Sequence, residues 1–364
     1  MHHIFHIDDN EEKKVHKEGT MKKNIAPYKN YAFLLVLLSF VPSCVHKKQI
    51  DKRVLYIDRV AKKTDIIVDS PPPITVWVHG TLIFRTPAHH KIFNNRSSLV
   101  HAQSLPENHH FKLLADTITE RDPEHFSAKE FYIFSWSGKL LHQERINASE
   151  KLYNDLVALT VEYQKKYNCY PVIRIITHSH GGNVALNMAK IKDQSTMPLR
   201  IKSLILLACP VQDRTMHFIN TPLFERVYSL YSSFDLIQII APQFHQNRAV
   251  GLTSLEKSRR YKMPLFSSRV FPHHPHVMQA KIKIDHYPIS HARFSTKEFA
   301  QILPNILQTL DTWDEQAQKN NTLHKHKLLC IYHRPTLLPP SPRLRQTSKT
   351  IKNRSQETPQ RYHT

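Results

Sequence analysis

The chain of 364 residues has few glycines and few cysteines, and both shortages narrow what it can be. Its four cysteines show neither a Cys-x-x-Cys pair nor regular spacing, which excludes a disulfide framework and a cysteine-based zinc site. It has six glycines, and four of them stand at Gly80, Gly138, Gly181 and Gly182, after apolar runs or a serine. In such a chain we expect glycine where a side chain would obstruct the backbone.

Acidic residues are scarce toward the C-terminal end. The formal net charge is +21, and from Lys319 onward ten Lys or Arg stand against one acid, Glu357. Helical and strand periodicity stops near Asp314, so we expect residues 315–364 to be a disordered basic tail. A solvated tail is the simplest interpretation, and contact with anionic lipid is the alternative. The sequence contains no motif for reading specific nucleic acid.

The N-terminal region has the features of an export signal. Residues 31–41 form an uninterrupted apolar run preceded by lysines, too short for a helix that spans a membrane. The following Val-Pro-Ser-Cys, which ends at Cys44, resembles a bacterial lipobox, in which the cysteine is acylated. This resemblance implies a lipoprotein of the bacterial cell envelope, and the non-acidic Val45 favours the outer membrane over the inner one. A plain signal peptide and an N-terminal signal anchor are the alternatives.

The remaining organisation follows from composition. We interpret residues 1–20, which precede a second methionine, as a non-native or disordered extension, and residues 21–44 as the signal peptide. Residues 45–73 are expected to be a linker with edge strands, and three consecutive prolines end it. Residues 74–314 are expected to form the folded domain.

Short apolar runs alternate with amphipathic segments through that domain. A helix is expected to begin at Asn147 and to end near Asn168, and the long segments 82–109 and 236–276 are expected to be irregular, as lids often are. Strands are expected at 54–60, 66–68, 74–79, 131–135, 172–177, 204–208, 227–232 and 277–284, and further helices at 180–192 and 296–310. This alternation predicts an α/β fold with a mostly parallel central sheet and helices on both faces.

The most informative functional pattern is Thr-His-Ser-His-Gly at residues 177–181. An apolar strand precedes it and an amphipathic helix follows, which is the strand–turn–helix context that exposes a nucleophilic serine. A serine hydroxyl becomes a nucleophile when a neighbouring base takes its proton. We therefore interpret Ser179 as the nucleophile, with capping of the following helix as its alternative role.

With this turn, the chain resembles the α/β-hydrolase superfamily, and within it the lipases and esterases, over residues 74–310. Val-His-Gly-Thr at 78–81 resembles the end of the family's oxyanion-hole strand. The resemblance implies that the amide of Thr81 or Leu82, together with the amide of His180, binds the developing oxyanion.

The family's chain order of Ser, Asp and His implies the rest of a catalytic triad. Asp235 lies just past an apolar strand and is interpreted as the acid, with Asp213 as the alternative. His291 resembles the family's histidine, which precedes the closing helix, while His286 lies almost on the strand end and is the alternative base. The base accepts the serine proton and passes it to the leaving group, while the acid fixes the imidazole tautomer.

Together these residues imply a membrane-attached serine hydrolase of the esterase or lipase type. It would cleave lipid or other apolar acyl esters through an acyl-enzyme, without a cofactor. The histidine clusters at 273–276 and 324–326 lack the spacing of a zinc site, so we predict no metal. Two alternatives remain: a catalytically inactive hydrolase fold with a binding role in the envelope, and a lipoprotein whose basic tail alone drives association.

Overall fold

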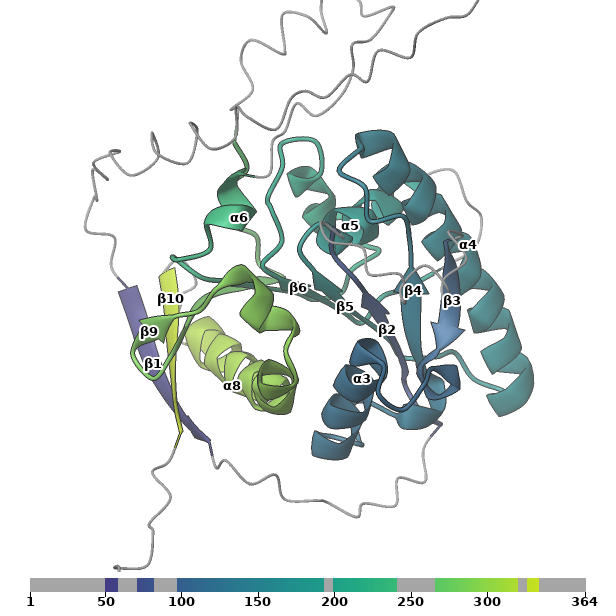
Figure 1. The fold of residues 1–364 in the computed structure, drawn as a ribbon, viewed down its shortest axis with the longest axis horizontal. Helices are drawn as coiled ribbons and strands as arrows, with labels where there is room; N and C mark the ends of the chain where they lie inside the picture. Colours follow the sequence, from purple (N-terminus) through teal and green to yellow (C-terminus); the bar gives the residue numbers. More distant parts are fainter. Residues whose placement is uncertain are drawn as a thin grey trace, which may run out of the picture. The chain divides into compact units, whose positions relative to one another are not determined.

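The computed structural model describes residues 50–57, 71–81, 97–192, 199–240, 266–319 and 326–333. The strands in these segments form one sheet (Figure 1). Their bounds are β1 (Ile50–Ile57), β2 (Ile74–Val78), β3 (Ser98–His101), β4 (Phe131–Ser135), β5 (Ile173–His178), β6 (Ser203–Leu207), β7 (Val227–Tyr231), β8 (Val277–Ile284), β9 (Tyr287–Pro288) and β10 (His326–His333). Across the sheet they follow the order β1-β10-β8-β7-β6-β5-β2-β4-β3, and β9 pairs with β8.

The sheet is mostly parallel, as predicted. All neighbouring strands from β1 to β4 in this order pair in parallel, while β3 with β4 and β8 with β9 are antiparallel. Strands β2, β6 and β7 are buried along their whole length. This burial explains their continuous apolar sequences, because a parallel strand meets core side chains on both of its faces.

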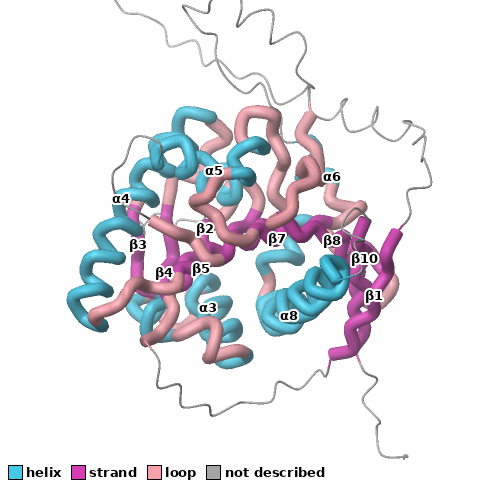
Figure 2. Tube along the Cα trace, turned by 180° about the vertical axis from the view of Figure 1, so that it is seen from behind, coloured by secondary structure: helices cyan, strands magenta, loops and turns pink. Residues whose placement is uncertain are grey.

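Helices cover both faces of the sheet, which confirms the predicted architecture. In two opposite views, α3 and α8 lie on one face and α4 and α5 on the other (Figures 1 and 2). One core cluster joins α3 and α8 to the sheet, and a second joins α4 and α5 to it. The helix bounds are α3 (His110–Arg121), α4 (His142–Tyr167), α5 (Gly181–Lys192), α6 (Leu236–Ile240) and α8 (Lys297–Lys319).

The helix α4 is longer than the sequence indicated. It begins at His142 rather than at Asn147, and the side chain of its N-cap residue, Leu141, makes no capping hydrogen bond. Without a polar cap, the true start carries no sequence signal. The predicted end is confirmed, because Asn168 adopts the left-handed conformation with φ of 53° and its amide donates to the carbonyl of Gln164.

The two segments expected to be irregular contain regular structure. Strand β3 lies within residues 82–109, and α6 lies within residues 236–276. Helix α3 follows the first of these segments, and its N-cap residue His109 also makes no side-chain capping bond. Residues 82–96 and 241–265 are outside the described residues, so the interpretation of these parts as lids stays a prediction.

The prediction of a disordered tail from residue 315 is wrong for two segments. Helix α8 continues to Lys319, and β10 inserts between β1 and β8, with Leu329 paired to Arg53 on one side and to Ile282 on the other. The side chains of Leu329 and Ile331 are fully buried. Their burial outweighs the basic composition that suggested disorder. Residues after 333 lie outside the described part of the chain.

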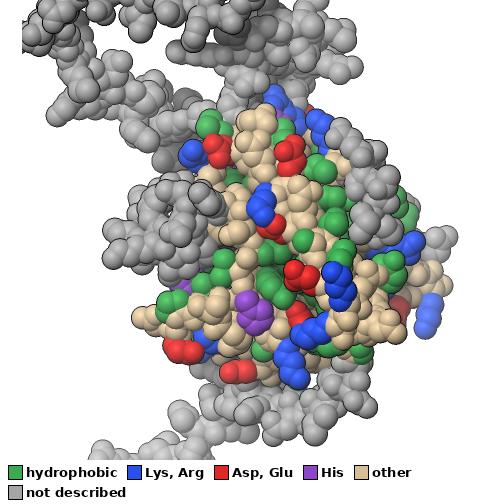
Figure 3. Space-filling view, turned by 90° about the vertical axis from the view of Figure 1, so that its right-hand side faces the viewer, with side chains coloured by type: hydrophobic (Ala, Val, Ile, Leu, Met, Phe, Trp, Pro, Cys, Tyr) green, Lys and Arg blue, Asp and Glu red, His purple; other side chains and the backbone are tan. Residues whose placement is uncertain are grey.

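The N-terminal predictions fall outside the described residues, since residues 1–49 and 58–70 are not among them. This holds for the extension, the signal peptide, Cys44 and the expected strand at 66–68. Among the described helices, none has both the length and the apolar character required to cross a membrane. On the side at the right of Figure 1, charged side chains of both signs are scattered among hydrophobic ones (Figure 3).

Candidate active site

Ser179 lies in a tight turn that directly follows the carboxyl end of β5 and leads into α5. Its φ of 53° is in the left-handed region that residues with a side chain rarely adopt. The Ser179 amide donates to the carbonyl of Leu207 at 2.9 Å, and the Ser179 carbonyl accepts from the Gly182 amide at 3.0 Å. The surrounding backbone thus maintains a strained serine at a strand-to-helix turn, as serine hydrolases of the α/β type require.

Two of the glycines allow this turn to approach the end of β2. A Cβ atom on Gly181 would lie 2.5 Å from the carbonyl oxygen of Val78 and 2.6 Å from that of His79. A Cβ atom on Gly80 would lie 2.8 Å from the Cβ of Ser179. Neither position has room for a methyl group, which confirms the expectation that the rare glycines mark close backbone contacts.

Asp235 and His291 form a buried hydrogen-bonded pair. His291 Nδ1 lies 2.7 Å from Asp235 Oδ2, and the side chain of Asp235 is completely buried. The second carboxylate oxygen accepts from the backbone amide of Gln238 at 2.9 Å. With Nδ1 donating to Asp235, the other ring nitrogen of His291, Nε2, is left as the proton acceptor.

The residue that precedes Ser179 contacts His291. The rings of His178 and His291 are 4.8 Å apart, and His178 Nε2 donates to the carbonyl of His291 at 3.1 Å. Burial lowers the pKa of His178 to about 3, and the charge of His291 contributes to this, so His178 stays neutral. Burial, Arg145 and His291 together lower the pKa of His180 well below its usual value. His291 therefore lies beside the turn that carries Ser179.

The alternative base and the alternative acid lie elsewhere in the network. His286 has a φ of 71° in the turn between β8 and β9, and its Nδ1 lies 3.0 Å from the hydroxyl of Tyr332 on β10. Asp213 lies in the segment after β6, whereas the carboxylate bonded to His291 belongs to Asp235. Among the two candidate acids and the two candidate bases, the structure thus joins Asp235 and His291 by a hydrogen bond.

The predicted oxyanion donors lie at two neighbouring backbone positions. His180 immediately precedes the first residue of α5, where backbone amides have no acceptor within the helix. Thr81 follows Gly80, which contacts Ser179, and Thr81 is partly exposed. Leu82, the other candidate, is outside the described residues. An amide at residue 81 and one at residue 180 would thus flank the serine, as an oxyanion hole requires.

His79 joins the ends of β2 and β4. Its Nδ1 donates to the carbonyl of Gly80 at 2.7 Å, and its Nε2 accepts from the Trp136 amide at 3.2 Å. The indole nitrogen of Trp136 donates back to the His79 carbonyl at 2.7 Å. With both ring nitrogens engaged, His79 fixes the loop at Gly80.

Sequence reasoning missed three side chains around the site. His178 supports the loop of His291, while Arg145 and Gln212 form a buried polar contact, with Arg145 Nη2 lying 3.4 Å from Gln212 Oε1. A signal for Arg145 was present in the sequence, because it precedes Leu152 by seven residues on the apolar face of α4. His178 is the last residue of β5, and Gln212 lies in the loop after β6, where no periodicity marks a functional side chain.

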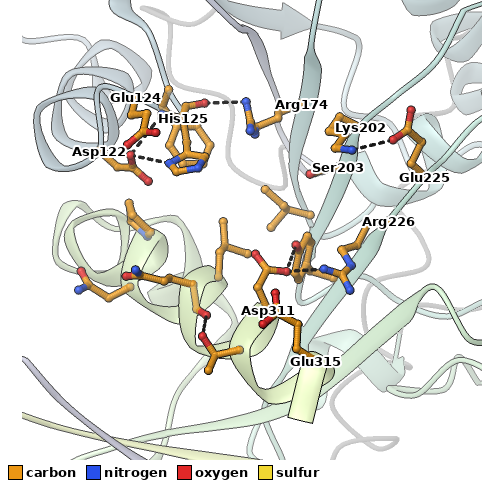
Figure 4. A pocket seen from close by; sticks show the side chains of 18 of the residues that line it. Asp122, Glu124, His125, Arg174, Lys202, Ser203, Glu225, Arg226, Asp311 and Glu315 are labelled. Carbon is orange, nitrogen blue, oxygen red and sulfur yellow. Dashed lines mark hydrogen bonds and ion pairs between the residues drawn. The ribbon is translucent and has the colours of Figure 1, made fainter. Parts of the chain in front are cut away.

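A large cavity lies at the opposite end of the sheet, between α3 and α8 (Figure 4). It has a volume of about 1170 Å³ and is lined by residues at the amino ends of β5, β6 and β7. Polar side chains contact each other there: Lys202 forms an ion pair with Glu225 and Arg226 with Asp311, and His125 Nδ1 is hydrogen-bonded to Asp122. Ligands of open parallel sheets bind at the carboxyl ends of the strands, so this cavity is not the candidate active site.

No cluster of three or more histidine, cysteine or acidic side chains within the described segments is arranged to hold a metal ion. The densest of the described histidine groups, at residues 273–276, instead shows ring packing between His274 and His276, whose centroids are 4.0 Å apart.

The sheet, the strained serine after β5 and the later Asp–His pair define an α/β-hydrolase fold. No family model and no curated protein matches the sequence. Solved structures with some similarity include carboxyl esterase 2 from the fungus Tuber melanosporum, with 10% identity, coverage of 88% of this chain and 95% of that chain, and a TM-score of 0.29.

Two further structures show a similarity of the same size. A dienelactone hydrolase from Anabaena variabilis has 10% identity over 80% of this chain and 92% of that one, with a TM-score of 0.25. A thermostable esterase from Pseudomonas putida has 13% identity over 79% and 73%, with a TM-score of 0.28. Similarity this low carries no information about activity, so the function has to come from the site itself.

Proposed function

We propose that this protein is a serine hydrolase that cleaves carboxylic esters, with Ser179 as nucleophile, His291 as base and Asp235 as the residue that orients the base. The observation that carries the proposal is the 2.7 Å bond between His291 and Asp235, beside a serine with a φ of 53°. These residues come from three separate segments of the chain. All three follow strands at the carboxyl edge of one sheet, which supports an arrangement for nucleophilic catalysis.

The chemistry follows from the positions of the groups. His291 Nε2 accepts the hydroxyl proton of Ser179 while Oγ attacks the ester carbonyl carbon. The amides of His180 and of residue 81 or 82 stabilise the oxyanion that forms. His291 then donates the proton to the leaving alcohol oxygen, and an acyl-enzyme remains. Water deprotonated by His291 attacks this acyl group in the second half of the reaction, which releases the acid and restores Ser179.

Apolar side chains beside the triad support an apolar acyl ester as the substrate class. Phe234 is 64% exposed, Leu236 48% and Ile237 50%, and all three lie within two residues of Asp235. Large apolar side chains grouped on a surface mark contact with lipid, a ligand or another protein. An acyl chain or the surface of a lipid aggregate would cover this group while its ester enters the site.

Ser179 is tested with a fluorophosphonate probe, which phosphonylates activated serines. We expect the wild-type protein to react and Ser179→Ala to be unreactive, because the probe needs this hydroxyl. Ser104→Ala removes an exposed serine that bonds to the carbonyl of His101, and we expect it to react like wild type. Circular dichroism checks that each variant is folded, and labelling that persists in Ser179→Ala would contradict the proposal.

The same probe assigns the base. His291→Ala should react roughly 10³- to 10⁴-fold more slowly, because the serine then loses its proton acceptor. His286→Ala, which removes a contact to Tyr332, should react at nearly the wild-type rate. The reverse order of rates would show that the base has been misassigned.

We also propose that the protein is attached to the bacterial cell envelope through an acylated Cys44, at the outer membrane in preference to the inner one. The apolar run and the lipobox-like segment that ends at Cys44 support this. The basic residues after Lys319 would add contact with anionic lipid. In cells supplied with an alkyne-labelled fatty acid, wild type should become labelled and sediment with membranes. Cys44→Ser should lose the label, and a Cys44→Ser variant that is still labelled would refute this attachment.

A further inference from the structure

Arg145, in the first turns of α4, is a buried cation without a counter-ion. It is 4% exposed, and its Nη1 donates to the carbonyl of Leu140 at 2.8 Å. Its Nη2 lies 3.4 Å from Gln212 Oε1, and its Nε has no hydrogen-bond partner. Among the described residues, no carboxylate forms an ion pair with it.

Such a residue does not stabilise the fold. Burial lowers the pKa of Arg145 to about 10, so the guanidinium remains charged at neutral pH. Proteins almost never bury an arginine completely unless it is paired, because removal of the charge from water is costly. Its place near the N-terminus of α4 adds repulsion from the helix dipole. An anion bound next to Arg145 would remove both penalties.

Other donors around Arg145 also lack acceptors. Gln212 is 2% exposed, its oxygen faces Arg145, and its Nε2 has no partner. His180 Nδ1 is 3.4 Å from the amide nitrogen of Asn183 and accepts from it, so the proton of this neutral ring is on Nε2, which has no partner either. Three N–H groups, on Arg145, Gln212 and His180, are therefore available to an acceptor that the described residues do not supply.

This group of donors lies next to the nucleophile. His180 directly follows Ser179, and hydrogen bonds through Asn183 and Thr215 link its ring to Gln212. Helices α4 and α5 follow β4 and β5, so their N-termini both lie at the carboxyl edge of the sheet, where backbone amides favour anions. Arg145, Arg214 and Lys190 add to burial in lowering the pKa of His142 to about 4, so positive charges lie near this end of α4.

We propose that Arg145, Gln212 and His180 form an anion-binding subsite, and that the ester cleaved at Ser179 carries a carboxylate or phosphate group close to the scissile bond. This rests on the proposed ester hydrolysis and specifies its substrate class. Together with the apolar side chains beside Asp235, it describes an amphiphilic ester, with an apolar chain and an anionic group at opposite sides of the carbonyl. The planar guanidinium suits both oxyanions, since each offers two acceptors in one plane.

The test compares paired esters that differ in the anionic group. The first pair is the mono-4-nitrophenyl ester of glutarate and 4-nitrophenyl hexanoate, with the charge on the acyl side. The second pair is a monoacylglycerol 3-phosphate and the corresponding monoacylglycerol, with the charge on the alcohol side. For at least one pair, we expect kcat/KM of wild type to be about 10- to 100-fold higher for the anionic member, since hydrogen bonds to charged groups differ by this much from neutral contacts.

Two variants remove the subsite in different ways. Arg145→Gln removes the charge, and Gln212→Glu places a carboxylate where an oxygen already faces Arg145, so that an internal ion pair occupies the guanidinium. Both should lower the ratio of kcat/KM toward one, and Gln212→Glu should also raise the melting temperature. Gln143→Glu adds the same charge to an exposed position of α4 and should leave the ratio unchanged.

A binding measurement separates this proposal from the proposed reaction. Glutarate or inorganic phosphate, compared with chloride at equal ionic strength, should raise the melting temperature of wild type and of Gln143→Glu, but not of Gln212→Glu. If this shift occurs while Ser179 fails to react with the fluorophosphonate, the subsite stands and the esterase proposal is wrong. If wild type shows neither the shift nor a preference for anionic esters, or if both variants retain them, the subsite is refuted.

Discussion

The two ends of the sheet both contain buried or half-buried arginines, but the arginine at one end is paired with carboxylates and the arginine at the other end is not. At the amino end, beside the large cavity, Arg226 contacts the carboxylate of Asp311 at 2.7 Å (Figure 4). It also contacts the carboxylate of Asp314 at 2.5 Å. At the carboxyl end, Arg145 is more deeply buried and contacts no carboxylate of a described residue. The arginine whose burial costs more free energy, Arg145, is thus the one without an ion-pair partner among the described residues.

This difference distinguishes charges that stabilise the fold from a charge that, in our proposal, binds the substrate. Asp311 also accepts from the hydroxyl of Tyr228 at 2.6 Å, so the ion pairs at the amino end bind α8 to β7. At the carboxyl end the cation and its neighbouring donors are held in place before any anion arrives. A fixed, water-excluded charge stabilises a bound or developing anion more strongly than a charge that must reorganise.

The larger predicted effect concerns the amino end of the sheet, where Arg226 forms ion pairs. Arg226→Met should reduce the free energy of unfolding by about 1–3 kcal/mol, because it leaves the buried carboxylate of Asp314 without its closest cation. Denaturant unfolding measures this, and kcat/KM of the folded variant for either ester pair should match wild type. A stable variant with altered kinetics would mean that the amino end takes part in function, and the contrast between the two ends would fail.

The smaller predicted effect concerns neutral histidines at the carboxyl end. The pKa of His178 falls from about 6.5 in the unfolded chain to about 3 in the folded protein, so below pH 6.5 the unfolded chain binds the proton more readily. The stability contributed by His178 is complete above pH 6.5 and is lost as the pH falls toward 3. Wild type should therefore lose several degrees more in melting temperature between pH 7 and pH 4 than His178→Gln.

His178→Gln keeps an N–H group for the carbonyl of His291 while it removes the titrating ring. The buried His180 and the partly buried His142 also have lowered pKa values, so the variant retains part of the acid sensitivity. His217→Gln changes an exposed histidine and serves as the control, with an acid response like that of wild type. Identical responses of His178→Gln and wild type would show that the neutral state of His178 does not contribute to stability.

Sequence patterns predicted the central strands well and the boundaries of the sheet poorly. Strands β4 and β8 have the predicted bounds, because their apolar side chains are local properties of the sequence. Strand β10 was missed because its burial depends on two distant partners, β1 and β8, and neighbouring basic residues dominated the composition. Helices α3 and α4 begin without side-chain caps, so the signals used for helix starts were absent.

The sequence identifies those candidate site residues whose position follows from the order of strands along the chain. Ser179 is recognisable from its strand–turn–helix context, and Asp235 from the strand before it. His291 was preferred to His286 only through the family resemblance, because both follow β8 within a few residues and the backbone path separates them. One histidine turns toward Tyr332, while the other enters the closing helix region beside Asp235.

The position of β10 between β8 and β1 has a consequence for the order in which the chain folds. Residues 50–57 are made early, yet their hydrogen-bonding partners are residues 326–333, more than 260 residues further along the chain. The edge of the sheet that β8 would otherwise expose is covered only when this late segment docks. During synthesis, this margin of the domain therefore cannot form until the C-terminal segment has been made, whereas the strands on both sides of the serine turn are already present.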